Sequence, residues 1–292
     1  MCATVNFREY NNIEEKMENI KTKGLSPEEK WENATLANSF IFYKVMRHHP
    51  DECKKIIEML LDVKIEKMEM HSEETIDLDH DSKGIRLDVF VKDSKRMYDI
   101  EMQILDTKEL PERSRYYSAL MALDTLKPGD LYSNLRDSHV IFICMEDIFK
   151  NGLPIDTFEF VCQEDNKTKL NDRDYRHFFI APICAKIAEK KEIKEFFEFL
   201  ISNQSNSDLT SRLKTHVEDA KHNMQWRNMY MTFERMQAYA FKDGLEEGKL
   251  DAKIEAAENL LKEGDSPEKV SRCTGLPLEQ VVKLAENISV TV

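Results

Sequence analysis

The chain has 292 residues, of which 41% are hydrophobic and 33% are charged, so it can bury a sizeable core beneath a strongly charged surface. A formal net charge of −13 argues against a protein that coats nucleic acid, because phosphate binding needs a local surplus of Lys and Arg. No run of 18 apolar residues and no basic-then-apolar leader occurs, and the six cysteines form no Cys-x-x-Cys pair. We therefore expect a cytoplasmic protein with reduced thiols, without a membrane span, a secretory signal or a disulfide framework.

Helix signals follow a polar leader, which we expect to be mobile over residues 1–25. Ser26 is typical of an N-cap, Pro27 suits the first helical position, and Glu29 completes a capping box. We expect one or two helices over residues 26–47 and a further helix over residues 52–61. Residues 63–81 are acidic and alternating, which favours an edge strand or a loop.

The hydrophobic period changes to two in residues 85–91 and again in residues 98–104, on either side of a polar turn. Two alternating runs around a short turn predict a β-hairpin. We expect Lys92 to pair with Met97 across this turn, which fixes the register of the hairpin.

The rest of the chain alternates short apolar runs with helical patterns. A helix is expected over residues 112–126, ended by Pro128 and Gly129. Residues 140–144 form a continuous apolar run, typical of a strand buried on both faces. Further strands are expected at residues 158–161 and 178–180, and long helices over most of residues 185–262. This order predicts an α/β or α+β core with a helical C-terminal part.

The C-terminal part is expected to be separate from the core. The organisation that we predict is a leader (1–25), a core (26–225), a long connecting helix (226–252) and a small helical tail (253–292). The tail holds two short helices around a Gly-containing turn, which fits a helix-turn-helix, but a plain helical hairpin is favoured because Glu279 and Glu286 suit DNA poorly. An apolar stripe from Met229 to Phe241 is expected to pack on the core, with the following polar part projecting or pairing in a homodimer; a monomer is the plain alternative.

Strand alternation divides the hairpin side chains between two faces. The polar face holds Arg86, Asp88, Phe90, Asp99, Glu101 and Gln103. In the expected register Asp88 lies opposite Glu101, with β-carbons roughly 4.5–5.5 Å apart. Two carboxylates at that distance need a cation or a shared proton, and a hard divalent ion with oxygen ligands meets that need. The plain alternative is a solvated polar face.

Two other groups of residues bear on the chemistry. The helix after the hairpin begins with Arg113, Arg115, Tyr116 and Tyr117, whose guanidinium and phenol groups suit phosphate contacts. The eight His are dispersed, and adjacent His residues at 48 and 49 cannot face one metal from a helix, so a His-containing zinc site and Cys–His catalysis are disfavoured.

Seven short sequence motifs occur along the chain. They are Phe42-Tyr43-Lys44-Val45-Met46, Gly84-Ile85-Arg86-Leu87-Asp88-Val89, Asp99-Ile100-Glu101-Met102-Gln103, Arg113-Ser114-Arg115-Tyr116-Tyr117, Ile141-Phe142-Ile143-Cys144, Gly244-Leu245-Glu246-Glu247-Gly248-Lys249 and Leu260-Leu261-Lys262-Glu263-Gly264. With these motifs the chain resembles the recombination-promoting nuclease family, also called PD-(D/E)xK-family transposases, over about residues 34–290.

The resemblance implies a restriction-endonuclease-like core, in which helices flank a central mixed sheet, and an endonuclease that hydrolyses DNA with Mg²⁺, or Mn²⁺ in its place, and promotes recombination. By that resemblance Asp88 and Glu101 hold the metal, and Gln103 orients water or a phosphate oxygen. Arg86 and Arg113 then neutralise phosphate charge.

Two departures keep a second interpretation open. Gln103 stands where most related nucleases place Lys, and Ser39 stands where the first helix of the family usually has an acidic residue. The alternative is a catalytically decayed nuclease core that serves as a DNA-binding or protein-binding scaffold. A strand-joining transposase rests on the family's name alone.

Overall fold

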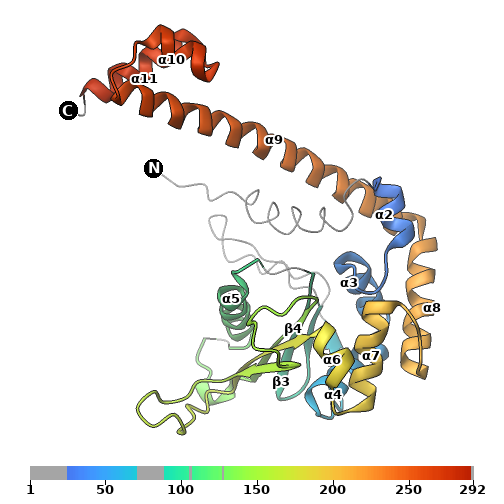
Figure 1. Cartoon of the computed structure of the whole chain (residues 1–292). Coiled ribbons are helices and arrows are strands. Elements are labelled where there is room, and N and C mark those ends of the chain that lie inside the picture. The colour runs from blue at the N-terminus through green and yellow to red at the C-terminus, as the bar shows by residue number, and fades with distance from the viewer. Residues whose placement is uncertain (1–24, 71–88, 105–106, 127, 291–292) are drawn as a thin grey trace. The chain divides into compact units, whose positions relative to one another are not determined.

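The computed structural model describes residues 25–70, 89–104, 107–126 and 128–290 (Figure 1). The expected leader up to residue 24, and Arg86 and Asp88 of the expected hairpin, lie outside the described residues. The chain divides into two compact units between Thr232 and Phe233, inside one long helix. No helix among the described residues is long and apolar enough to cross a membrane.

The helix start at Ser26 is confirmed. Helix α2 (Pro27–Asn33) begins with a capping box, in which the Ser26 hydroxyl accepts from the Glu29 amide and the Glu29 carboxylate accepts from the Ser26 amide at 2.7 Å. Two more helices follow directly: α3 (Ser39–His48), capped by Asn38, and α4 (Pro50–Leu61), with Pro50 in its first turn.

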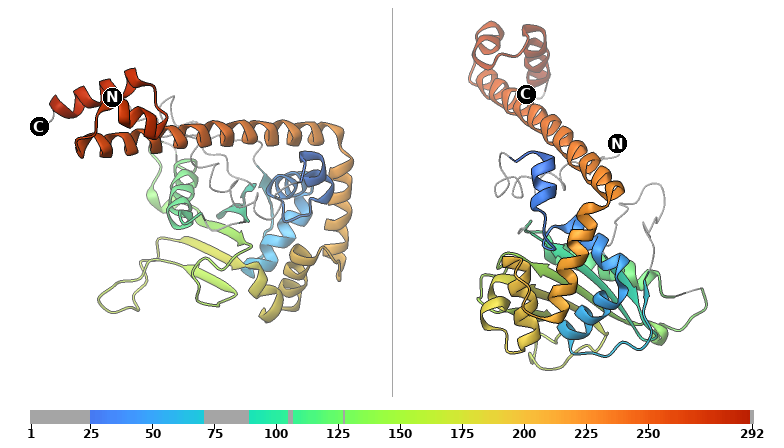
Figure 2. Two further views of the ribbon diagram at one scale, coloured as in Figure 1. Left: turned by 45° about the horizontal axis from the view of Figure 1, so that its top comes forward. Right: turned by 90° about the vertical axis from the view of Figure 1, so that its right-hand side faces the viewer.

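Six strands form one mixed sheet in the order β1-β2-β3-β4-β6-β5. They are β1 (Glu69–Met70), β2 (Val89–Lys92), β3 (Arg96–Gln103), β4 (Asp137–Cys144), β5 (Ile155–Phe158) and β6 (Asp174–Ile180). The pairs β1–β2, β2–β3 and β5–β6 are antiparallel, while β3–β4 and β4–β6 are parallel. Helices flank this sheet on both faces, so the predicted α/β class is confirmed (Figure 2).

The register of the hairpin is confirmed as far as the structure describes it. Lys92 pairs with Met97, and the pairing continues to Val89 opposite Ile100. The strand was expected at residues 158–161, but β5 begins and ends three residues earlier, at Ile155 and Phe158. Val161 forms only an isolated bridge with Lys169.

The two faces of the sheet are covered differently. On one face, α2, α3 and α4 pack with α6 (Ala181–Ile187), α7 (Lys191–Ser202) and α8 (Asp208–His222) around a large apolar core. On the other face lies α5 (Leu110–Leu123), whose Leu110, Tyr117 and Met121 pack with Phe142 and Phe178 of the sheet. A short 3₁₀ helix (Tyr132–Asn134) precedes β4.

Helix α9 (Met224–Lys262) holds the expected apolar stripe. Trp226 and Tyr230, one helical turn apart, pack with the core, and Tyr230 is only 2% exposed. Met229, in the same unit as the core, is 40% exposed, and Phe233 and Met236, in the C-terminal unit, are 46% and 66% exposed. The face of α9 that is buried is set by the aromatic pair at its start.

The C-terminal unit has a small core of its own. Helix α10 (Pro267–Thr274) begins after Ser266 as expected, and α11 (Leu278–Val290) runs beyond the expected end at Ala285. Gly275 separates them in the left-handed region, at φ 71°. The residues buried together are Ala257, Val270, Leu276 and Val281.

Candidate functional site

Glu101 and Gln103 come from β3 and lie on the sheet face that α5 covers. Each is 3% exposed, and Asp99 on the same face is fully buried. The face is therefore not solvated, which contradicts the plain alternative from the sequence for these residues. Burying three polar side chains beside one another requires partners, since an unpaired buried charge costs several kcal/mol.

Arg113 of α5 is the partner that joins Glu101 to Gln103. Its Nη1 donates to Gln103 Oε1 at 2.8 Å, and its Nη2 lies 3.3 Å from Glu101 Oε2. The same Nη2 donates to the Tyr117 hydroxyl at 3.0 Å, one helical turn further along α5. We call Glu101, Gln103, Arg113 and Tyr117 the β3–α5 cluster.

Aromatic rings enclose this cluster. The Arg113 guanidinium lies 5.5 Å from the Tyr117 ring centroid and 5.8 Å from that of Phe142, within the range of cation–π attraction. Burial raises the pKa of Tyr117, and the nearby Glu101 carboxylate raises it further. The Tyr117 phenol is therefore protonated at neutral pH and can donate a hydrogen bond to an anion.

The donor set of the cluster fits a hard cation. The Glu101 and Gln103 oxygens both point to one cationic group, the Arg113 guanidinium, and carboxylate and amide oxygens are the ligands that Mg²⁺ and Mn²⁺ prefer. Asp88, expected as the second carboxylate, lies outside the described residues. It directly precedes Val89, which pairs with Ile100 beside Glu101.

The other residues expected at the site lie around α5 or outside the described residues. Arg115 is exposed, Tyr116 is half-buried, and Tyr117 is buried in the cluster. Arg86 belongs to the part of the chain that is not described. Ser39 is the first residue of α3, whose buried side chains pack on the sheet face opposite to α5.

Sequence reasoning missed a group that could hold a metal ion, formed by His49, Glu52 and His216. One ligand atom from each lies within 4.8 Å of the others. His49 and Glu52 are three residues apart at the start of α4, which a sequence can show, but His216 comes from α8, far along the chain. Only the fold brings His216 to this position.

The geometry of this group resembles an ion pair more than a finished metal site. The His49 and His216 rings stack at 3.5 Å with 15° between their planes, so their nitrogen lone pairs run nearly parallel and one ring must turn to share a metal. Arg212 Nε lies 3.1 Å from Glu52 Oε1. Burial opposes ionisation of Glu52, but hydrogen bonds from the backbone and from His216 hold its pKa below the ordinary value. Burial and His216 lower the pKa of His49.

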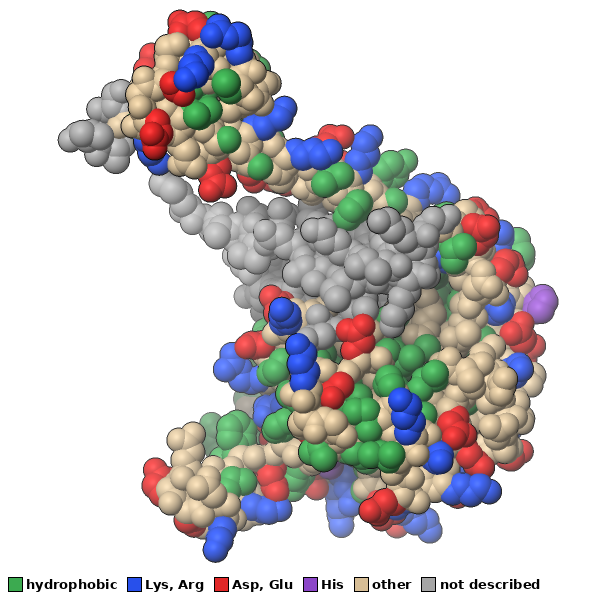
Figure 3. Space-filling model, viewed as in Figure 1, with side chains coloured by type: hydrophobic (Ala, Val, Ile, Leu, Met, Phe, Trp, Pro, Cys, Tyr) green, Lys and Arg blue, Asp and Glu red, His purple; other side chains and the backbone are tan. Residues whose placement is uncertain are grey.

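Charges of both signs are interspersed over the described residues on the face shown in Figure 3, rather than gathered in one basic patch. This agrees with the net charge of −13. This face therefore offers no extended basic surface among the described residues.

The chain was also compared with known protein families, with curated proteins and with solved structures. A family model described as a PD-(D/E)XK nuclease family transposase matches residues 52–255, which is most of the chain. Neither the comparison with curated proteins nor that with solved structures gave a match. The matched range includes the whole sheet, α5 and the β3–α5 cluster, while Ser39 and His49 lie outside it.

Proposed function

Because this chain belongs to the PD-(D/E)XK nuclease family transposases, we propose that it is a Mg²⁺-dependent endonuclease that hydrolyses DNA phosphodiester bonds. The observation that carries this proposal is the β3–α5 cluster, in which two buried oxygen ligands converge on one cationic group. A cytoplasmic location and a role in recombination, through breaks made in DNA, are parts of the same proposal.

Asp88 and Glu101 are the proposed ligands for Mg²⁺, or for Mn²⁺ in its place. The register from Lys92–Met97 to Val89–Ile100 supports this pairing, because its continuation by one residue would set Asp88 opposite Glu101. The chemistry that a bound divalent ion supplies is polarisation of a phosphoryl oxygen and activation of water. Gln103, with an amide in place of the Lys of most related nucleases, orients the water or a phosphate oxygen and cannot act as a cationic stabiliser.

Arg113 has two roles in this proposal. Without DNA it neutralises Glu101 beneath α5. When DNA is bound, its guanidinium turns to a phosphate oxygen, because the planar fork of Arg suits bidentate contacts with phosphate. Arg86, Arg115, Tyr116 and Tyr117 complete the phosphate contacts.

Cleavage of supercoiled plasmid tests the proposal. The wild type should nick or linearise plasmid in Mg²⁺ but not with a chelator, and the isosteric changes Asp88→Asn and Glu101→Gln should abolish cleavage while leaving the melting temperature measurable. Glu112→Gln, an exposed carboxylate on α5, is the matched control and should cleave like the wild type. Cleavage that survives Asp88→Asn or Glu101→Gln rules out these ligands.

A decayed nuclease core that binds DNA or protein is the second candidate. Ser39 and the Arg113–Glu101 ion pair favour it, because both reduce the negative charge available to a metal. Gln103 favours it because a neutral amide cannot supply the cationic stabilisation of a Lys. Titration calorimetry with Mg²⁺ and Mn²⁺ separates the two candidates. A protein that binds DNA but neither ion is a scaffold.

A further inference from the structure

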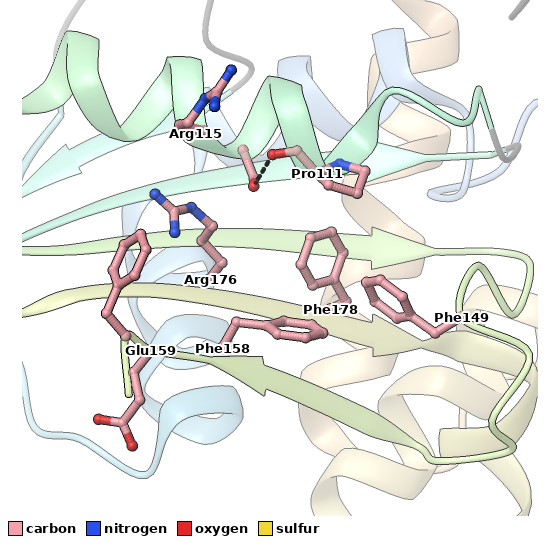
Figure 4. Close-up of a pocket in the computed structure, with 9 residues that line it drawn as sticks. Pro111, Arg115, Phe149, Phe158, Glu159, Arg176 and Phe178 are labelled. Atoms are coloured by element: carbon pink, nitrogen blue, oxygen red, sulfur yellow. Dashed lines mark hydrogen bonds between the residues drawn. The ribbon is translucent and has the colours of Figure 1, made fainter. Parts of the chain in front are cut away.

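A pocket lies on the α5 side of the sheet, between α5 and the strands β5 and β6 (Figure 4). Its cavity volume is about 310 Å³, at the lower end of the range for sites that enclose a small ligand. Four of its nine lining residues are phenylalanines. The lining residues are Pro111, Ser114, Arg115, Phe149, Phe158, Glu159, Phe160, Arg176 and Phe178.

The aromatic rings of the pocket form walls rather than a filled core. Phe178 is 1% exposed, and the rings of Phe149 and Phe158 meet it edge-on, at 5.1 Å and 89° and at 5.7 Å and 84°. Phe158 and Phe160 themselves are 43% and 50% exposed. The site therefore combines a buried ring with two partly exposed rings, and partly exposed aromatic rings are the surface on which unpaired bases stack.

The charges at the pocket favour an anion. The Arg176 guanidinium is held over the Phe160 ring, 5.6 Å from its centroid, and its Nη2 donates to Asp174 at 2.7 Å. Arg176 Nε is buried and has no hydrogen-bond partner among the described residues, so the side chain would have to move for this nitrogen to donate to a ligand. The Glu159 carboxylate is paired with Lys169, and the exposed Arg115 adds a second cation.

The pocket lies beside the β3–α5 cluster. Glu101 pairs with Phe142, and Phe142 pairs with Phe178 in the next strand, so these three residues form one row on one face of the sheet. Two strand spacings place the Phe178 backbone roughly 10 Å from that of Glu101. Arg113 of the cluster and Arg115 of the pocket come from the same turn of α5.

We propose that this pocket holds the base of an unpaired nucleotide beside the bond that is cut, so that single-stranded or locally opened DNA is the preferred substrate. The inference rests on the proposed nuclease function and names its substrate class. The base stacks on Phe158 and Phe160, and the adjoining phosphate lies against Arg115 and Arg176. A base inside a duplex cannot reach such a pocket without leaving the stack.

The pocket should accept any of the four bases. The Ser114 hydroxyl donates to the Pro111 carbonyl oxygen at 2.7 Å, so it is already used within α5. The Phe rings offer stacking surface without donors or acceptors that distinguish one base from another.

Fluorescence anisotropy with labelled oligonucleotides tests the inference without cleavage. The full chain is titrated, with a chelator present, into a single-stranded 12-mer and into the same sequence as a duplex. The wild type should bind the single strand more tightly, and Phe160→Ala should weaken that binding roughly tenfold, the scale of one lost base–aromatic stack. Phe160→Tyr should restore it, and Tyr132→Ala, which removes an 83% exposed aromatic outside the pocket, should leave it unchanged.

Photocrosslinking with 5-iododeoxyuridine and peptide mapping gives an independent readout, with the adduct expected at Phe158 or Phe160. Equal affinity for single strand and duplex, or unchanged affinity of Phe160→Ala, overturns the pocket inference even if the wild type cleaves plasmid. Conversely, Phe160-dependent binding by a protein that never cleaves in Mg²⁺ supports the pocket and contradicts the proposed nuclease function.

Discussion

Arg113 is one buried guanidinium that satisfies an acid, an amide and a phenol at once. Its side chain is 13% exposed and that of Glu101 is 4% exposed, so water screens this ion pair little. Removing one partner of such a pair leaves an uncompensated buried charge, whereas removing both charges together can be nearly neutral.

Replacing Arg113 should therefore destabilise the fold strongly. With a chelator present, we expect Arg113→Met to lower the free energy of unfolding by about 3–5 kcal/mol, because Glu101 loses its cation. Adding Glu101→Gln to Arg113→Met should recover most of that loss, and this coupling can be measured by urea denaturation of the four proteins. Arg115→Met, a change at an exposed neighbour, should stay within about 0.5 kcal/mol of the wild type.

The same variant reports on metal binding. If Mg²⁺ binds at Glu101, it should stabilise Arg113→Met more than the wild type, because the competing guanidinium is gone. Equal stability of Arg113→Met and the wild type without metal would show that the ion pair seen in the structure does not form in solution.

A second buried pair links two neighbouring strands. His139 Nδ1 lies 3.1 Å from His177 Nε2, and the Thr157 hydroxyl lies 3.2 Å from His177 Nδ1. Burial lowers the pKa of His177 to about 4, and burial together with His177 and Arg96 lowers the pKa of His139 to about 3. Both imidazoles are neutral in the fold at pH 7.

This pair makes the fold sensitive to acid. Unfolded histidines protonate near pH 6.5, whereas the folded pair does not until about pH 4 and below, so stability is lost as the pH falls through that window. We expect His177 alone to contribute a loss of about 3 kcal/mol between pH 6.5 and pH 4. His177→Gln should flatten the pH dependence of the free energy of unfolding, while His222→Gln, at an exposed position, should keep the slope of the wild type. A slope unchanged in His177→Gln contradicts this account, and His49, whose pKa is also lowered, would then be the next residue to test.

At the scale of elements, the hairpin shows what the sequence could predict. Alternation fixes which side chains share a face, and the turn fixes the pairing of Lys92 with Met97, so both follow from local sequence. The same pattern could not show that α5 covers the face that holds Glu101. That contact depends on tertiary packing, which has no local signal.

Other elements show the same limit. The strand expected at residues 158–161 is displaced to Ile155–Phe158, because the apolar pattern does not show which residues pair with β6. The group of His49, Glu52 and His216 joins α4 to α8. It could not be predicted from the sequence, because only tertiary packing brings these two helices together. Strand β3, by contrast, holds polar residues although it is almost wholly buried. Buried strands are normally apolar, and departures from that rule are expected at functional sites.

At the scale of the whole molecule, helix α9 links the two compact units and carries exposed apolar residues. Met229, Phe233, Met236 and Tyr239 are between 40% and 66% exposed, and they recur at spacings of three and four, so they form one stripe on the helix. Contiguous apolar surface on a soluble protein is typical of protein–protein and ligand contacts.

We predict that this stripe pairs with a second copy of the chain, which would bring two nuclease sites to one DNA molecule. Light scattering should give the mass of a dimer for the full chain and of a monomer for Phe233→Glu with Met236→Glu, because two buried carboxylates would face each other across the contact. Ala238→Glu adds a charge at an exposed position on the side of α9 opposite to Met229 and Met236 and should remain a dimer. A shortened chain that ends at Asp243 keeps the stripe and should also dimerise if the stripe alone makes the contact. A monomer mass for the unaltered full chain at micromolar concentration would contradict the prediction, and each site would then cut one strand at a time.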